Sequence, residues 1–240
     1  MDATGIDVSR YQGAIDWPTV AAHVDFAYVR AGIGSIYKDP RAFQNVTGAT
    51  AAGLLVGVYH VVRWDYPAAD QLANLRAMLA EMPPLSLPIA LDVELPTPAG
   101  STAAHRAALA ATRELVTELA RDCRPTDSDR CLIYTGAWWW DPAIKGADSR
   151  WALTADLWVA SYTSTPRMPA GPWAHWHLWQ HSSTGRIPGI AGNVDLNRFA
   201  GTRLDLVAYA VGCGCSIPPT PPPTTHTITV TGHNITIQVD

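Results

Sequence analysis

The sequence predicts an α/β barrel of eight strands with a reduced set of helices, followed by a short β-hairpin. Short runs dense in Val, Ile, Leu and aromatic residues recur along the chain, as in buried parallel strands. Helical patterns separate the early runs, and strand–helix alternation favours a parallel sheet with right-handed crossovers. The eight predicted strands are Ile6–Val8, Phe26–Ala31, Leu54–Val62, Ile89–Val93, Leu132–Thr135, Leu157–Tyr162, His177–His181 and Val194–Phe199.

Good helical patterns lie only in the first half of the chain. Beyond Tyr134 the signal weakens, so we expect loops to join most of the later strands. An open doubly wound sheet is the rival architecture, but residues 9–13 lack the glycine pattern of its phosphate loop. The predicted helices are one opened by Asp16 as N-cap with Pro18 in its first turn, Pro40–Ala52 closed by Gly53, Pro67–Met82, and Thr102–Asp122.

Composition limits the classes of partner. The 240 residues suit one barrel domain and a short extension. Lys and Arg number 17 against 21 Asp and Glu, so the chain has no basic footprint and nucleic acid is not an expected partner. No apolar run reaches the length of a membrane span, so membrane insertion is not expected. The ten Trp residues fit a carbohydrate cleft, where flat rings stack on sugars, as well as a packed core.

The four cysteines do not predict a metal site. Cys123 and Cys131 flank a polar turn, and Cys213 and Cys215 lie close together near the end. Structural zinc needs tighter paired spacing, so we expect neither metal nor cofactor. A disulfide between Cys123 and Cys131 and free thiols both fit the sequence.

The chain divides into three parts. Residues 1–210 form the predicted barrel, residues 211–225 a Gly-, Cys- and Pro-rich linker, and residues 226–240 a hairpin of two strictly alternating strands. An isolated hairpin is marginal in water, so it should dock on the main domain or on copies of itself. Because it lacks aromatic residues for sugar stacking and exposes strand edges, we expect a homo-oligomerisation element.

Four acidic residues occupy positions where a barrel places its chemistry. Asp92 and Glu94 follow a short apolar run, and alternation along a strand would point both to one side. Asp7 ends the first strand, and Asp195 lies in the last, which neighbours the first when a barrel closes. Buried paired carboxylates suit general acid work beside a second anionic group, as in glycoside hydrolysis.

Short motifs follow one another in a fixed order along residues 4–200. They are Gly5-Ile6-Asp7-Val8-Ser9, Gly57-Val58-Tyr59-His60, Leu91-Asp92-Val93-Glu94, Ile133-Tyr134-Thr135-Gly136, Leu157-Trp158-Val159-Ala160-Ser161-Tyr162, Leu178-Trp179-Gln180 and Val194-Asp195-Leu196-Asn197. In this order they resemble the glycoside hydrolase family 25 muramidases, the Chalaropsis-type lysozymes common among bacteriophage endolysins. One departure is Arg30–Gly34, which lacks the acidic residue that the family often has there.

The resemblance implies a flattened TIM-like barrel that hydrolyses the β-1,4 bond between N-acetylmuramic acid and N-acetylglucosamine in bacterial peptidoglycan. It implies Glu94 as the general acid, whose pKa neighbouring carboxylates and partial burial would raise. Asp92 would attack the anomeric carbon or orient the 2-acetamido group that attacks instead, while Asp7 and Asp195 would orient and tune. The resemblance gives four substrate-binding candidates: Tyr59, Tyr134, Trp158 and Gln180. Trp64 and Trp138 are two more, because they lie in loops expected at the carboxyl ends of the strands.

Two other functions fit the same sequence. The chain could be an inactive cell-wall binding module, or a barrel glycosidase acting on another polysaccharide. Met1–Thr4 leads directly into the first strand without a visible signal peptide. We therefore expect synthesis in a host cytoplasm and release through a phage membrane pore to the cell wall, with secretion as the alternative.

Overall fold

The computed structural model describes residues 2–94, 101–122, 131–211, 225–230 and 233–238. Eight strands close into a barrel in the order β1-β2-β4-β5-β6-β7-β8-β9, with β9 pairing back onto β1. All eight predicted strands are confirmed. Their bounds are β1 Thr4–Val8, β2 Phe26–Ile33, β4 Leu55–Val61, β5 Ala90–Asp92, β6 Leu132–Thr135, β7 Asp156–Ala160, β8 Leu178–Gly185 and β9 Val194–Phe199.

The direction of β9 is the main departure from the predicted parallel barrel. Strands β1 to β8 of the closed ring pair in parallel, whereas β9 runs antiparallel to both of its neighbours, β8 and β1. The connection from β8 is short and contains turn residues, and a short connection can join only antiparallel neighbours. A further two-residue strand, β3 (Tyr37–Lys38), pairs with the end of β2 outside the ring.

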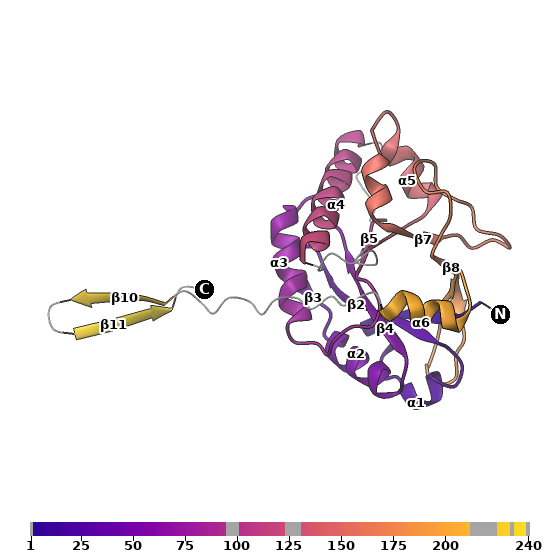
Figure 1. The fold of residues 1–240 in the computed structure, drawn as a ribbon, viewed down its shortest axis with the longest axis horizontal. Helices are drawn as coiled ribbons and strands as arrows, with labels where there is room; N and C mark the ends of the chain where they lie inside the picture. Colours follow the sequence, from indigo (N-terminus) through magenta and orange to yellow (C-terminus); the bar gives the residue numbers. More distant parts are fainter. Residues whose placement is uncertain (1, 95–100, 123–130, 212–224, 231–232, 239–240) are drawn as a thin grey trace.

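The predicted helices are present along the first half of the chain. Figure 1 shows α2 (Ala42–Ala51), α3 (Ala68–Leu79) and α4 (Thr102–Asp122) along the outside of the strands. The short α1 (Trp17–Val20) begins after Asp16, whose side chain accepts from the Thr19 amide as a capping residue does. Within the described ranges, no helix is both long and apolar enough to cross a membrane.

The later helices were not predicted. Helix α5 (Ala137–Ile144) and the 3₁₀ helix η2 (Arg150–Thr154) connect β6 to β7, and α6 (Arg203–Val211) follows β9. Helix α6 packs Leu206 and Ala210 against Phe199 and Ala3, so it covers the amino-terminal ends of the parallel strands. It ends at Val211, the first residue of the predicted linker.

Alternating side chains divide the apolar core into two layers. Ile133, Leu157 and Val159 belong to the layer between the strands and the outer helices. Their sequence neighbours Leu132 and Trp158 belong to the layer inside the barrel. Because successive side chains of a strand point to opposite faces, strands covered on both faces read as continuous apolar runs. Polar residues at inward positions near the carboxyl ends then stand out.

The C-terminal strands β10 (Thr225–Val230) and β11 (His233–Gln238) pair with each other in an antiparallel hairpin, as predicted. The Pro-rich linker lies outside the described residues, as do Cys123, Cys213 and Cys215. Cys131 is buried just before β6.

Candidate active site

A pocket of about 380 Å³ lies at the carboxyl ends of the parallel strands. Eight of the ten predicted site residues line this pocket, although they come from seven strands and from the segment after β5. They are Asp7, Tyr59, Asp92, Glu94, Tyr134, Trp158, Gln180 and Asp195.

Strand register brings the site residues together. Asp7 lies directly opposite Asp195 in the β1–β9 pair, and Gln180 lies opposite Asn197 in the β8–β9 pair. Across the parallel strands, Asp92 is paired with Tyr134, which is paired with Trp158. Directly opposite residues share one face of a sheet, so these side chains all project into the barrel. The predicted proximity of the first and last strands is confirmed.

Asp7 is the most strongly held acid of the site. Its Oδ2 accepts hydrogen bonds from Gln180 Nε2 at 2.9 Å and from Asn197 Nδ2 at 2.8 Å. Burial raises the pKa of Asp7, and these two amide donors oppose that rise because they stabilise the charged form. The indole Nε1 of Trp158 donates to Asn197 Oδ1 at 2.9 Å, which fixes the amide with its NH₂ group toward Asp7.

Gln180 is oriented in the same way. Its Oε1 accepts from the hydroxyl groups of Tyr134 at 2.9 Å and Tyr162 at 2.7 Å. With both donors on the oxygen, the NH₂ group of Gln180 must face Asp7. Two series of hydrogen bonds therefore lead to the Asp7 carboxylate. One runs from Trp158 through Asn197. The other runs from Tyr134 and Tyr162 through Gln180.

Glu94 has the protonation behaviour that a general acid needs. Burial is the main cause that raises its pKa to about 7, and the charge of Asp7 adds to the effect. A hydrogen bond with Tyr134 acts in the opposite direction. The direction of the shift agrees with the sequence expectation, but the order of causes differs, since burial exceeds like-charge repulsion. Near neutral pH, Glu94 can therefore hold a proton.

The other two acids also favour their neutral forms. Burial, followed by the charge of Asp7, raises the pKa of Asp195 to about 8. Burial raises the pKa of Asp92 well above its ordinary value, and the charges of Glu94 and Asp7 add to this. Asp92 Oδ1 is buried without a hydrogen-bond partner in the described part of the protein. The Asp92 residue as a whole is 7% exposed and lines the pocket.

Two predicted substrate-binding residues, Trp64 and Trp138, lie outside the walls of this pocket. Trp64 packs partly against the apolar core and lines a separate hollow between the β4–α3 connection and α4. Trp138 is 59% exposed on α5, while the adjacent Trp139 and Trp140 are buried. The expectation that the three consecutive tryptophans are not all core residues is correct, and the Trp138 indole packs over Gly136 at the start of α5.

Sequence reasoning missed several residues of the site. Tyr162, which follows β7, lines the pocket and bonds to Gln180. Asn197 was within a recognised motif, and its spacing of two residues from Asp195 is a signal that could have identified it. Ser9, Tyr11, Gln12 and Arg30 form another part of the pocket wall. Among the described residues, no three His, Cys, Asp or Glu side chains are arranged to hold a metal ion.

Replacing Asn197 with Leu tests the hold on Asp7. The Asn197→Leu variant should be less stable by about 1–3 kcal/mol at pH 7, because a buried carboxylate loses one of its donors. The loss raises the pKa of Asp7 further, so the penalty should shrink as pH falls and Asp7 takes up a proton. Urea unfolding of wild type and variant from pH 7 to pH 4 measures this difference.

Part of the difference in unfolding free energy should not change with pH, because the Trp158 indole N–H loses its acceptor at every pH. A difference that does not shrink toward low pH would contradict the assigned role of the Asn197–Asp7 hydrogen bond.

Comparison with known proteins identifies the family of this chain. The sequence profile of glycosyl hydrolases family 25 matches residues 6–190. Lysozyme M1 of Streptomyces globisporus is 34% identical over 211 residues, covering 86% of this chain and 70% of that protein. An N,O-diacetylmuramidase of Arthroderma benhamiae is 26% identical, with 82% of this chain and 86% of that protein covered. The crystal structure of a lysozyme from Streptomyces coelicolor superposes with a TM-score of 0.71 at 33% identity, covering 88% of this chain and 97% of that one. The chain belongs to glycosyl hydrolases family 25 and is a glycoside hydrolase.

Proposed function

We propose that this enzyme is a muramidase that hydrolyses the β-1,4 bond between N-acetylmuramic acid and N-acetylglucosamine in bacterial peptidoglycan. The observation that carries the proposal is a protonatable Glu94, with a pKa of about 7, beside the buried Asp92 in one pocket. The names of its lysozyme and muramidase relatives support the same substrate. Catalysis by a carboxylic acid beside a second carboxyl group is the usual chemistry of glycoside hydrolysis.

In the proposed mechanism, Glu94 donates its proton to the leaving glycosidic oxygen. Asp92 lines the same pocket, and its buried Oδ1 accepts no hydrogen bond within the described structure. The position of Asp92 beside Glu94 supports a role in which it orients the N–H of the 2-acetamido group while the acetamido oxygen attacks the anomeric carbon. Direct attack by Asp92 is the alternative, and its raised pKa disfavours that route because a nucleophilic carboxylate must be ionised.

We assign orienting roles to the remaining site residues. Asp7 and Asp195 tune the charge of the pocket, because the charge of Asp7 raises the pKa of both Glu94 and Asp195. Tyr59, Tyr134, Trp158 and Gln180 form the walls against which the sugar would lie. An inactive binding module is disfavoured because both Glu94 and Asp92 are present. Analysis of the reaction products distinguishes a muramidase from a glycosidase that acts on another polysaccharide.

We further propose that residues 1–210 are the catalytic domain, residues 211–225 a linker and residues 226–240 an assembly element. The hairpin supports the last assignment, since β10 and β11 pair only with each other in the described part of the chain. Both outer edges of such a sheet can pair with another copy. A phage origin and release through a membrane pore stay predictions from the sequence.

Replacing Glu94 with Gln tests the central assignment. Glu94→Gln keeps the size of the side chain but removes the transferable proton, so clearing of a peptidoglycan suspension should slow by about 10²–10⁴-fold. Labelling of the new reducing ends should reveal muramic acid in the wild-type digest. Equal clearing by wild type and variant, or glucosamine at the new ends, would refute the muramidase assignment.

The pH profile tests the protonation state. Because Glu94 must be protonated and its pKa is about 7, kcat/KM should fall above about pH 7. The Tyr134 hydroxyl lowers this pKa when its single proton turns from Gln180 to an ionised Glu94, so Tyr134→Phe should move the alkaline limb to higher pH. Tyr162→Phe is the matched control, because it removes a hydroxyl bonded to the same Gln180 oxygen.

The control should leave the position of the limb near that of the wild type. The assignment of the limb to Glu94 fails if Tyr134→Phe moves it to lower pH, or if both variants move it equally.

The hairpin proposal predicts a change of mass. A variant that ends at Pro218 should scatter light as a monomer, whereas the full chain should scatter as an assembly, because removal of β10 and β11 removes the strand edges that pair. Multi-angle light scattering measures both masses, and peptidoglycan clearing by the shortened chain checks that its barrel is folded. The same number of subunits in both chains would rule out the assembly role.

A further inference from the structure

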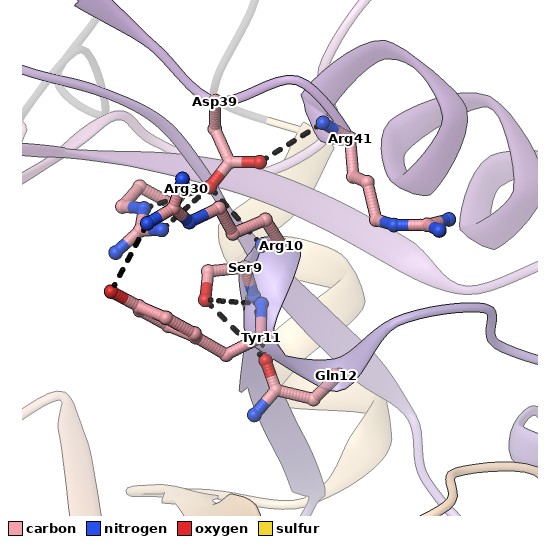
Figure 2. Close-up of polar contacts among 7 residues, drawn as sticks. All are labelled: Ser9, Arg10, Tyr11, Gln12, Arg30, Asp39 and Arg41. Atoms are coloured by element: carbon pink, nitrogen blue, oxygen red, sulfur yellow. Dashed lines mark hydrogen bonds and ion pairs between the residues drawn. The ribbon is translucent and has the colours of Figure 1, made fainter.

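Arg10, Arg30 and Arg41 gather around Asp39 beside Tyr11 (Figure 2), and Tyr11 and Arg30 line the pocket that holds the acids. At the centre of this cluster is Asp39, which is 3% exposed. Its carboxylate accepts from the Arg30 guanidinium at 2.8 Å, from the Arg10 backbone N–H at 3.1 Å and from the Arg41 backbone N–H at 3.0 Å. The negative charge of Asp39 is therefore already shared among three partners, of which only Arg30 brings a cationic side chain.

The Arg10 side chain carries a positive charge without a carboxylate partner in the described structure. Its Nη2 donates to the Tyr11 hydroxyl at 3.5 Å. The cluster holds three arginines and one aspartate, so positive charge is in excess. Adjacent residues 31–34 contribute no acidic group. This end of the site is thus suited to an anion.

The Arg10 segment is held in place before any ligand binds. Residues Arg10–Gln12 form the 3₁₀ helix η1, and Ser9 and Gln12 close a reciprocal capping box around it. The guanidinium of Arg10 lies 5.1 Å from the centre of the Tyr11 ring and 5.6 Å from that of Tyr37. Arg30 stacks against the same two rings at 5.2 and 5.6 Å. Cation–π contacts of this kind orient a guanidinium without neutralising it.

This cluster is continuous with the catalytic pocket. Ser9, Tyr11 and Arg30 line the same pocket as the four acids. Arg10 follows Asp7 by three residues, so their Cα atoms are at most about 11 Å apart. A glycan lying in the pocket would therefore have acids at the cleavage point, Arg30 in the pocket wall and Arg10 next to it.

We infer that Arg10, supported by Tyr11 and Arg30, forms a subsite for a carboxylate attached to a muramic acid residue of the substrate. The inference rests on the proposed function, since peptidoglycan glycans carry carboxylates where chitin-like polymers carry none. The ligand chemistry has two sources, namely the lactyl carboxylate of a muramic acid without a peptide, or an acidic group of the peptide stem. In either case the charge of Asp7 repels the anion, and the arginines attract it toward their end of the pocket.

The test measures equilibrium binding in the Glu94→Gln background, so that no turnover is needed. Three ligands are compared: glycan strands that carry stems, strands freed of stems whose lactyl carboxylates are ionised, and the freed strands after those carboxylates are amidated. Arg10→Gln should weaken binding of a carboxylate-bearing strand about three- to fivefold, the range for an exposed ion pair. Binding of the amidated strand should not change.

Arg41→Gln is the matched control, because it removes one positive charge from the same cluster. The Arg41 side chain points away from Tyr11 (Figure 2), and its Nη1 donates to Gln44 Oε1 at 3.5 Å. The control should therefore bind all three ligands normally. The effect of Arg10→Gln should also fade near 1 M salt, where the Debye length falls to about 3 Å.

Selective loss on the freed strands identifies the lactyl carboxylate, and selective loss on stem-bearing strands identifies the stem acid. Unchanged binding to every strand, or equal loss on the amidated strand, would overturn the subsite. Failure of the wild type to clear peptidoglycan would instead overturn the proposed function, and the binding comparison would still decide the subsite.

Discussion

The buried carboxylate of Asp7 is the interaction on which the rest of the site depends. A carboxylate inside a protein costs several kcal/mol unless hydrogen-bond donors replace water. Here the donors are the amides of Gln180 and Asn197, which come from β8 and β9. Because β1 meets β9 at this point, the network that holds the acid also joins the strands that close the barrel. The same hydrogen bonds therefore help to close the barrel and to keep the buried Asp7 carboxylate charged.

The antiparallel direction of β9 makes this arrangement possible. A strand that runs against its neighbours presents its first residues at the end where the others finish, so Asp195 and Asn197 reach the pocket from the start of β9. If β9 were parallel, Phe199 would lie at the site end instead. In the observed antiparallel direction, Phe199 instead packs near α6. The apolar end of β9 therefore helps to fill the amino-terminal side of the barrel.

The strands and the acids could be predicted because both follow short-range patterns, and most of the rest depends on where loops and helices turn. Strand alternation predicted that Asp92 and Glu94 point to the same side, and both side chains line the pocket. Strand β5 itself ends at Asp92. The strand geometry continues beyond it because the Val93 N–H donates to Tyr134 O at 2.9 Å. The placement of Trp138 could not be predicted, because its position after β6 does not reveal that α5 begins one residue earlier. The role of Arg10 depends on Asp39, which is 29 residues away, and no local pattern reports that contact.

The distribution of protons in the pocket follows from the same hierarchy. Burial raises the pKa of all four carboxyl groups, but only Asp7 accepts two amide hydrogen bonds that favour its charged form. Its charge then raises the pKa of Glu94, Asp92 and Asp195, so a single ionised group helps to keep its neighbours neutral. The acidic character of Glu94 is consequently set at a distance by Gln180 and Asn197, neither of which needs to touch the reacting sugar. Without these two amides the pKa of Asp7 would be higher and its carboxylate would be more readily protonated. Glu94 would then lose the part of its pKa rise that comes from the charge of Asp7.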